Sequence, residues 1–493
     1  MHPPILPASA TGDDILVGRS PPITARERTV PLHRRQDPSG QPDVEINPVY
    51  VQEAGHQVPR NALPRRGMLP GTALQVVRDE LILDGNARLN LATFVTTWME
   101  PQAQQLMTEC LDKNMIDKDE YPQTAELEAR CVSILAGLWH AAAGGAATGC
   151  STTGSSEACM LGGMALLWHW RQRAAGRPAG QPNLVMGANV QVCWEKFCRY
   201  WQVEPRKVPL EPGRLHLTGP AAAARCDENT IGVVAILGST MDGSYEPVHE
   251  ISAELDRLAA AGGPDVSIHV DGASGGFIAP FLQPDLAWDF RVPRVVSINA
   301  SGHKYGLVYP GIGWVVWRDA AALPADLVFN VNYLGGQMPT FALNFSRPGA
   351  HVAAQYYNFL RLGFDGYRRV QQACQDVALH VSSQVASMGP FELLSDGSEL
   401  PVFAFRISDP GAGFTVFDLS ERLRTRGWLV PAYTFPEDLQ DMAVLRIVVR
   451  NGFSRDLADL FLADLRRHWR ALAAHPHANV PLAAEPMRQG FAH

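Results

Sequence analysis

Ser-Gly-His-Lys-Tyr-Gly, at residues 301–306, is the stretch around which the rest of this 493-residue chain is organised. It follows a short apolar run, Arg-Val-Val-Ser-Ile at 294–298, whose β-branched residues predict a buried strand of an α/β sheet. Lys304 should then lie at the carboxyl end of that strand, where open α/β sheets bind ligands. An amine held there can lose its proton and attack a carbonyl carbon. An ordinary surface lysine fits these six residues equally well.

A second stretch, residues 149–158, predicts an anion site. It places small residues and hydroxyls before a predicted helix, and Ser155 or Ser156 can cap that helix while Glu157 suits its first turn. Free amides and hydroxyls at a helix start bind anions. Ordinary N-capping explains the same pattern, because the stretch has neither a Walker lysine nor GxGxxG spacing.

A third signal is an acid at another strand end. The runs 231–237 and 266–270 predict strands, and the segment between them predicts a helix, which together form a βαβ unit. The second run ends at Asp271, beside the expected ligand crevice, although a turn or capping aspartate is the commoner case for a lone Asp-Gly. Pyridoxal phosphate requires this combination: a helix start for its phosphate, a carboxylate for its pyridine nitrogen and a lysine for its aldehyde.

Bulk composition excludes several classes of protein. The chain is 46% hydrophobic and 19% charged with a net charge of −8, so no basic field predicts binding to nucleic acid or an anionic membrane. The eight cysteines show neither a CxxC pair nor zinc spacing, which predicts no metal site and fits a reducing cytoplasm. The start lacks the features of a secretory signal, and the longest uncharged stretch is too rich in Gly, Ser and Thr to span a membrane.

The chain is expected to have five parts. Residues 1–70 hold twelve of the 37 prolines, which predicts a mostly flexible arm over 1–72, with contact to a partner subunit as the weaker alternative. After it we expect an N-terminal segment at 73–100, a large cofactor-binding domain at 101–348, a small domain at 349–474 and a tail at 475–493. Further strands are predicted at 183–186, 313–317, 401–407, 428–430 and 444–450. Further helices are predicted at 102–112 and 124–142 and from about residues 415 and 454.

Long strings of the chain resemble a known family. They are Leu-Asp-Gly-Asn-Ala-Arg (83–88), Gly-Ser-Ser-Glu-Ala-Cys-Met-Leu-Gly-Gly-Met (154–164), Ala-Ser-Gly-Gly-Phe (273–277), Ser-Gly-His-Lys (301–304), Tyr-Leu-Gly-Gly-Gln (333–337) and Asn-Phe-Ser-Arg-Pro (344–348). From about residue 80 onward, the chain closely resembles the bacterial glutamate decarboxylases, which are group II pyridoxal-phosphate-dependent decarboxylases. The resemblance implies a type I pyridoxal-phosphate (aspartate-aminotransferase-like) α/β fold. That fold has a large, mostly parallel seven-stranded sheet domain and a small C-terminal α+β domain.

The resemblance also implies roles for individual residues. Lys304 would form the Schiff base with the cofactor, and His303 would lie near the phosphate and the reacting carbon. Asp271 would pair with the pyridinium nitrogen, while Ala273 and Gln191 would pack on opposite faces of the ring. The implied cofactor contacts are Ser155, Ser156, Gln191, Thr240, Asp271, Ala273, Ser301, His303, Lys304 and Ser346.

Some of the implied residues come from a shared site or bind the substrate. Ser346 resembles a serine that reaches the phosphate from a neighbouring subunit, on a loop that also carries Tyr333 and Leu334. The region that binds the substrate carboxylate matches Thr93, Phe94, Asn114 and Asp117, and Arg450 matches the substrate-binding arginine.

The implied activity is decarboxylation of L-glutamate to 4-aminobutanoate and CO2, which consumes a proton and is linked to acid resistance. Lys304 or a group near His303 would return the proton to Cα. The implied assembly is a homo-oligomer with a dimer as its catalytic unit, often built into a hexamer. Two alternatives stay open: a decarboxylase for another amino acid, and a catalytically silent homologue with a structural or regulatory role.

Three features depart from the family pattern or extend it. The first 70 or so residues do not match the short N-terminal helix of the family. Glu195 stands where bacterial relatives often have histidine, a change that can shift the pH profile. The chain ends in Phe-Ala-His493, which resembles a tail that closes over the active site near neutral pH, so we expect His493 to be regulatory.

Overall fold

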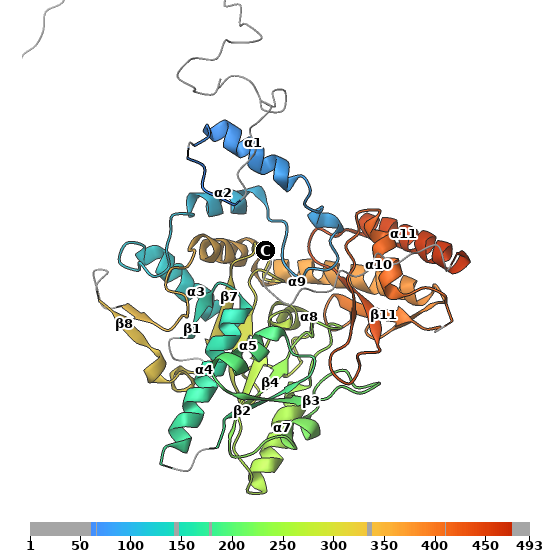
Figure 1. The fold of residues 1–493 in the computed structure, drawn as a ribbon. Coiled ribbons are helices and arrows are strands. Elements are labelled where there is room, and N and C mark those ends of the chain that lie inside the picture. The colour runs from blue at the N-terminus through green and yellow to red at the C-terminus, as the bar shows by residue number, and fades with distance from the viewer. Residues whose placement is uncertain are drawn as a thin grey trace, which may run out of the picture. The chain divides into compact units, whose positions relative to one another are not determined.

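The computed structural model describes residues 61–65, 67–141, 147–176, 180–332, 338–409 and 411–475 (Figure 1). The chain divides into two units, residues 1–84 and 85–493. The described part of the first unit contains helix α1 (Pro70–Leu81), whose first residue is a proline, as suits a position that needs no amide hydrogen bond. The helix thus begins within the predicted arm. Most of that arm, together with Tyr333, Leu334 and His493, lies outside the described residues.

A seven-stranded sheet forms the centre of the second unit, with the strand order β1-β7-β6-β5-β4-β2-β3. Neighbours from β3 to β6 are parallel, and β7 runs antiparallel to both β6 and β1. The predicted mostly parallel seven-stranded sheet is therefore confirmed. The strands are β1 (Thr148–Thr152), β2 (Asn183–Gly187), β3 (Glu204–Val208), β4 (Thr230–Ile236), β5 (Ile268–Asp271), β6 (Val295–Ala300) and β7 (Gly313–Trp317).

Helices cover the sheet, so its central strands read as unbroken apolar runs; every residue of β4 is buried. Helix α4 contacts β1, β4, β5, β6 and β7, and α3 contacts β1 and β7. The helices of this part are α2 (Pro101–Glu109), α3 (Pro122–Leu138), α4 (Ser155–Ala174), α5 (Val192–Tyr200), α6 (Gly219–Ala223), α7 (Val248–Ala260) and α8 (Ala279–Leu282). A hairpin of β8 (Phe329–Val331) and β9 (Met338–Thr340) follows β7.

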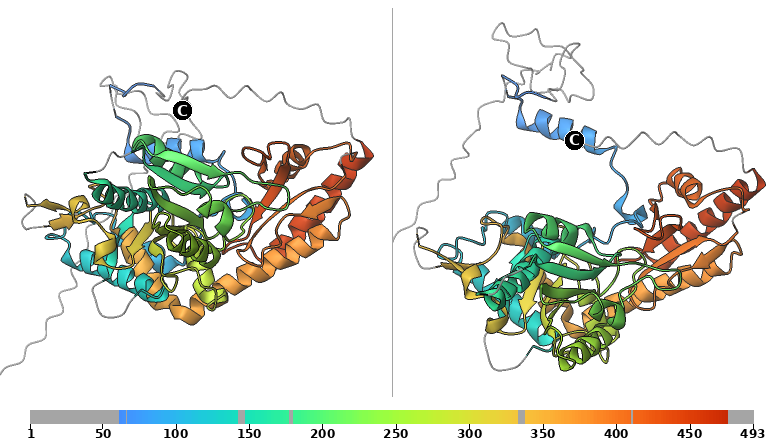
Figure 2. Two further views of the ribbon diagram at one scale, coloured as in Figure 1. Left: turned by 90° about the horizontal axis from the view of Figure 1, so that it is seen from below. Right: turned by 60° about the horizontal axis from the view of Figure 1, so that its bottom comes forward.

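Helix α9 (Ala350–Ala386) joins the large sheet to a smaller one, as the long orange helix in Figure 2 shows. It contacts α2 and α3 as well as β10, β11 and α11. Gly363 interrupts it with a φ of 58°, a conformation that glycine adopts at little cost. The smaller sheet has the order β10-β11-β13-β12 and antiparallel neighbours. Its elements are β10 (Phe391–Leu393), β11 (Val402–Ile407), β12 (Ala432–Thr434), β13 (Ala443–Val448), α10 (Val416–Arg424) and α11 (Arg455–Ala474).

One predicted strand is wrong. Residues 428–430 are not a strand; only an isolated bridge pairs Leu429 with Asn90, and the strand is β12, a few residues later. Trp428 and Val430 are instead buried in the apolar cluster of the small domain, so their hydrophobicity reflects packing and not ladder pairing. Among the described residues, no helix is long and apolar enough to cross a membrane.

Candidate active site

A cavity of about 340 Å³ lies beyond the carboxyl ends of the parallel strands β4, β5 and β6. The chain segments that leave these three strands line it together with the start of α4 and the segment that enters α5. The lining residues include the predicted cofactor contacts Ser155, Ser156, Gln191, Thr240, Asp271, Ala273, Ser301, His303 and Lys304. A larger, more open hollow beside β3 is lined by none of the predicted residues.

Lys304 is a buried amine in this cavity. Its Nζ donates to Ser274 Oγ over 3.1 Å and lies 5.0 Å from the centre of the Phe94 ring. Burial lowers the pKa of Lys304, because the charged form loses its hydration, and the nearby Asp271 only partly opposes this effect. The environment therefore favours the neutral amine, which is the nucleophilic form.

Asp271, the last residue of β5, is a buried carboxylate surrounded by donors. Trp194 Nε1 donates to its Oδ2 over 2.9 Å, and Asn299 Nδ2 and the amide of Ala273 donate to its Oδ1 over 3.1 Å each. The Cys159 thiol lies 3.6 Å from Oδ2. Each of these contacts points a hydrogen-bond donor at a carboxylate oxygen. A carboxylate held in this way at the cavity wall fits a pyridine nitrogen that carries a proton.

The same carboxylate belongs to a group with metal-ligand chemistry. Among the residues that the structure describes, Cys159, Cys193 and Asp271 offer ligand atoms that lie within 4.8 Å of one another. The sequence predicted no metal site. We assign no metal to this group, because both oxygens of Asp271 already accept hydrogen bonds.

The start of α4 has the character of an anion site. Its N-cap is Gly154, which makes no side-chain capping bond, so the predicted capping by Ser155 or Ser156 is not found. Instead Ser155 Oγ lies 2.6 Å from Ser301 Oγ at the cavity. The first amides of a 20-residue helix and these hydroxyls remain for a ligand, as the phosphate of the cofactor requires.

His303 lies next to this helix start. A Cβ atom at position 154 would stand 3.0 Å from His303 Cε1, so a glycine there admits the imidazole ring. Burial, with smaller contributions from Lys304 and His351, lowers the pKa of His303 to about 4. The ring is therefore neutral near pH 7, and its position agrees with the predicted place near the phosphate.

A second cluster gathers Ser346 and Asn114 outside the cavity lining. Asn114 Nδ2 donates to Ser346 Oγ over 3.3 Å, and Asn114 Oδ1 accepts from the amide of Arg347 over 3.1 Å. The amide of Asp117 bonds to the carbonyl of Asn114, so Asp117 belongs to the same cluster. The structure thus brings three predicted residues together, but not at the cavity of their own chain.

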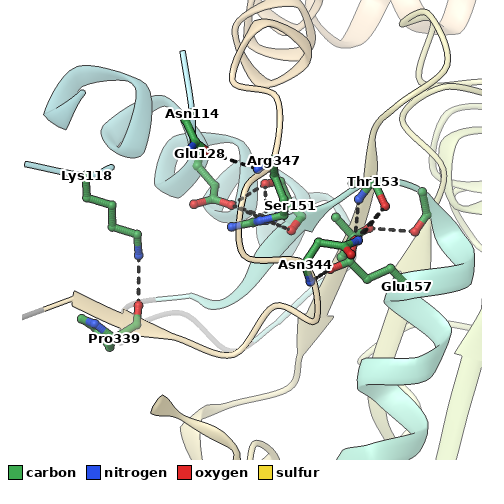
Figure 3. A network of polar contacts seen from close by, with 11 residues as sticks. Asn114, Lys118, Glu128, Ser151, Thr153, Glu157, Pro339, Asn344 and Arg347 are labelled. Carbon is green, nitrogen blue, oxygen red and sulfur yellow. Dashed lines mark hydrogen bonds and ion pairs between the residues drawn. The ribbon is translucent and has the colours of Figure 1, made fainter. Parts of the chain in front are cut away.

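The segment that carries Ser346 is fastened to the start of α4 (Figure 3). The buried Glu157 carboxylate accepts from the amide of Asn344 over 3.2 Å and from its Nδ2 over 3.0 Å. The same carboxylate accepts from the amide and hydroxyl of Thr153 over 2.8 and 2.9 Å. One side chain therefore links the predicted phosphate site to the segment predicted to serve a neighbouring subunit.

Arg450 donates hydrogen bonds to oxygen atoms of the segment 87–97. Its Nε donates to the Thr93 carbonyl over 3.0 Å, its Nη1 to Thr97 Oγ1 over 2.5 Å, and its Nη2 to the carbonyls of Ala87 and Asn90 over 2.9 and 2.6 Å. Neither Arg450 nor Thr93 lines the cavity. The structure therefore shows these two residues as an anchor for the segment 87–97, and their predicted substrate role stays a prediction.

Arg446 is a residue that the sequence analysis missed. It lies on β13 with its guanidinium carbon 4.8 Å from the centre of the Phe94 ring. Its Nη2 donates to the Ala92 carbonyl over 2.7 Å and its Nη1 to the Thr240 carbonyl, while its Nε is buried and unpaired among the described residues. A charged residue between the buried Leu445 and Ile447 was the available signal.

Glu195, the departure noted in the sequence, lies in the first turn of α5 and forms an ion pair with Lys207. Its side chain is about half exposed, at 46%, and does not line the cavity. Any effect of Glu195 on the pH profile would therefore act at a distance through its charge.

Comparison with known proteins agrees with this geometry. Residues 64–408 match the model of the pyridoxal-dependent decarboxylase conserved domain. A glutamate decarboxylase of Aliivibrio fischeri is 56% identical over 441 residues, which cover 88% of this chain and 94% of the relative. Glutamate decarboxylase 5 of Arabidopsis thaliana is 50% identical over 431 residues, or 87% of either chain. The solved structure of a Lactobacillus brevis glutamate decarboxylase is similar with a TM-score of 0.83 at 47% identity, and covers 86% of this chain and 97% of that one. The chain therefore belongs to the pyridoxal-dependent decarboxylase family.

Proposed function

We propose that this chain decarboxylates L-glutamate to 4-aminobutanoate and CO2. The observation that carries the proposal is the cavity in which the buried amine of Lys304, the donor-held carboxylate of Asp271 and the open start of α4 lie together. The similarity to relatives named glutamate decarboxylase supports the choice of substrate.

When bound, pyridoxal 5'-phosphate supplies a protonated ring that takes up the electron pair left by the departing CO2. Asp271 would pair with the ring nitrogen and so favour its protonated form. The amides of the first turn of α4 and the hydroxyls of Ser155, Ser156 and Ser301 would bind the phosphate. Gln191 and Ala273, on the cavity lining, would hold the ring between them.

Lys304 has two tasks. Its amine would hold the cofactor through the aldehyde group, and once the substrate amine takes its place, Nζ would be free to carry a proton. We assign it the return of a proton to Cα, with neutral His303 nearby and the Ser274 hydroxyl, 3.1 Å from Nζ, holding the amine in place. The reaction takes up one proton for each CO2 released. This proton uptake suits an enzyme that works best in acid and contributes to acid resistance.

Arg446, which like Arg450 does not line the cavity, is our candidate for binding a substrate carboxylate. Its charged guanidinium lies against Phe94, the ring that Lys304 also contacts, and keeps one buried donor without a partner in the described part of the chain. An acidic substrate would satisfy both the charge and the donor.

A second copy of the chain would complete the site. Asn114, Asp117 and Ser346 share one cluster that does not line their own cavity, and Ser346 is exposed. We therefore assign all three to the active site of a neighbouring subunit in a dimer, often part of a hexamer. All eight cysteines are free thiols, which supports placing the enzyme in the cytoplasm.

The test is CO2 release from L-glutamate, L-aspartate and aromatic amino acids between pH 4 and pH 8. We expect turnover of glutamate alone, fastest in acid, and at least about a thousandfold loss in Lys304→Ala. Turnover of another amino acid would favour the alternative decarboxylase. A colourless chain without imine absorption that borohydride can remove would favour the catalytically silent homologue.

A further inference from the structure

Behind Asp271 lies a line of buried polar side chains that no step above uses. Asn299 Nδ2 donates to Asp271 Oδ1 over 3.1 Å, and Asn299 Oδ1 lies 2.8 Å from His269 Nε2. His269 Nδ1 in turn lies 2.7 Å from Ser297 Oγ. His269, Asn299 and Ser297 are each 0% exposed. The line therefore begins in the core of the sheet, on β5 and β6, and ends at the cavity wall.

The direction of each hydrogen bond follows from the chemistry of its ends. Because the Asp271 carboxylate only accepts, Asn299 must present its amide nitrogen to it, which leaves Asn299 Oδ1 as an acceptor. His269 Nε2 must then carry the hydrogen. Burial lowers the pKa of His269, so the ring is neutral and its Nδ1 accepts from the Ser297 hydroxyl. All three donors thus point toward Asp271.

The histidine ring is held in this orientation by its neighbours. A Cβ atom at Gly162 of α4 would stand 2.5 Å from His269 Nδ1 and Cε1, so the helix backbone lies directly against the ring. The Trp194 ring lies edge-on to it, with 5.1 Å between centroids, and Trp194 Nε1 donates to the other oxygen of Asp271. The packing therefore leaves the imidazole little freedom to turn away from Asn299.

We propose that His269 and Asn299 are positioning residues, which hold the Asp271 carboxylate aimed at the cavity through a hydrogen-bond relay that starts at Ser297. The inference rests on the proposed function, because the task of the relay is to make Asp271 a stronger partner for a protonated ring nitrogen. Hydrogen bonds aligned in one direction polarise one another, so the end of such a chain is a better donor than an isolated amide.

Other groups that face Asp271 do not replace the relay. Cys159 of α4 is a neutral thiol, because burial raises its pKa well above the usual range, and Cys193 of α5 lies beside it. Lys304 follows β6, and burial lowers the pKa of its amine. Glu246 would repel Asp271 if charged, but burial raises its pKa to about 7.

The test compares two ligands of the full-length apoenzyme: pyridoxal 5'-phosphate and its 1-deaza analogue, in which a carbon replaces the ring nitrogen. The variants are Asn299→Leu, which removes the donor to Asp271, and His269→Phe, which keeps an aromatic ring. His269→Gln is the conservative variant, because its amide can take the place of Nε2. Asn358→Leu is the control for the loss of a buried hydrogen bond elsewhere. It removes the bond from Asn358 Nδ2, on α9, to the Leu307 carbonyl.

We expect Asn299→Leu and His269→Phe to raise the Kd for pyridoxal phosphate about tenfold, as for the loss of a hydrogen bond to a charged group, and to leave the Kd of the deaza analogue unchanged. His269→Gln should restore most of the wild-type difference between the Kd values of the two ligands. Asn358→Leu should change the two Kd values by the same factor. The relay would be refuted if these variants weakened the binding of both ligands equally, or weakened the binding of neither. If one variant fails to fold, the other decides. A wild-type chain that binds neither ligand would instead refute the proposed function.

Discussion

The guanidinium carbon of Arg446 lies 4.8 Å from the centre of the Phe94 ring. Lys304 Nζ lies 5.0 Å from the centre of the same ring, so one aromatic side chain contacts both the reactive amine and the nearest cation on β13. Arg450, four residues later, donates its hydrogen bonds to oxygen atoms of the segment 87–97. The two arginines should therefore respond differently to the same substitution.

Arg446→Lys keeps the charge but loses the planar fork, so we expect the KM for glutamate to rise about tenfold. Arg450→Lys should leave KM unchanged and lower the melting temperature, because several backbone carbonyls lose their donor. Steady-state kinetics and thermal unfolding on the two variants check both statements. The reverse pattern would show that Arg450 binds the substrate and that Arg446 supports the fold.

Complementation between two inactive chains tests the shared site. Lys304→Ala lacks the amine, and Ser346→Asp would place a negative charge against the phosphate of the neighbouring subunit. Randomly mixed dimers of the two should regain about a quarter of the wild-type activity, because half of them contain one intact site. The matched control mixes Lys304→Ala with His303→Leu, because both substitutions fall on residues that line the cavity of their own chain. No dimer in that mixture contains an intact site, so it should regain no activity. Failure of the first mixture to recover would place Ser346 outside the partner's site.

Asn344→Leu tests the link in Figure 3 between the Ser346 segment and the start of α4. The change leaves the Glu157 carboxylate without the 3.0 Å bond from Asn344 Nδ2, so that only the bond from the amide of residue 344 still ties the segment to it. We expect about fivefold weaker binding of pyridoxal phosphate, the size of one net hydrogen bond. Asn330→Leu, at an exposed position of β8, is the matched control. Identical cofactor affinity in both variants would show that the link has no part in holding the phosphate site.

The buried His303 should make the apoenzyme less stable in acid. Its pKa is about 4 in the folded chain against the ordinary 6.5, so the unfolded chain takes up the proton first as the pH falls. The stabilisation is full above pH 6.5, decreases below it and is lost near pH 4, by about 3 kcal/mol in all. Urea unfolding of wild type and His303→Gln at several pH values should give a difference that shrinks across this window. A difference that stays constant with pH would contradict the assigned burial effect.

Much of the site follows from the sequence. The apolar runs at 231–237, 266–270 and 294–298 predict buried strands, and the polar residues that follow a buried parallel strand emerge at its carboxyl edge. Asp271 and Lys304 were therefore predictable as neighbours, and the structure places both on one cavity. The hydroxyls of Ser155 and Ser156 were predictable as part of a helix start. That neither hydroxyl caps the helix was not predictable.

Only the tertiary structure separated residues that look alike in one dimension. Arg446 and Arg450 belong to the same short stretch of the chain, but one lies against Phe94 and the other binds oxygen atoms of the segment 87–97, because their partners come from distant segments of the chain. Asn114 likewise meets Ser346 across 232 residues of sequence, and His269 meets Asn299 because β5 and β6 are neighbours in the sheet. Local periodicity determines which residues are buried and where strands end, whereas the choice of polar partner depends on packing between distant segments, which no local pattern contains.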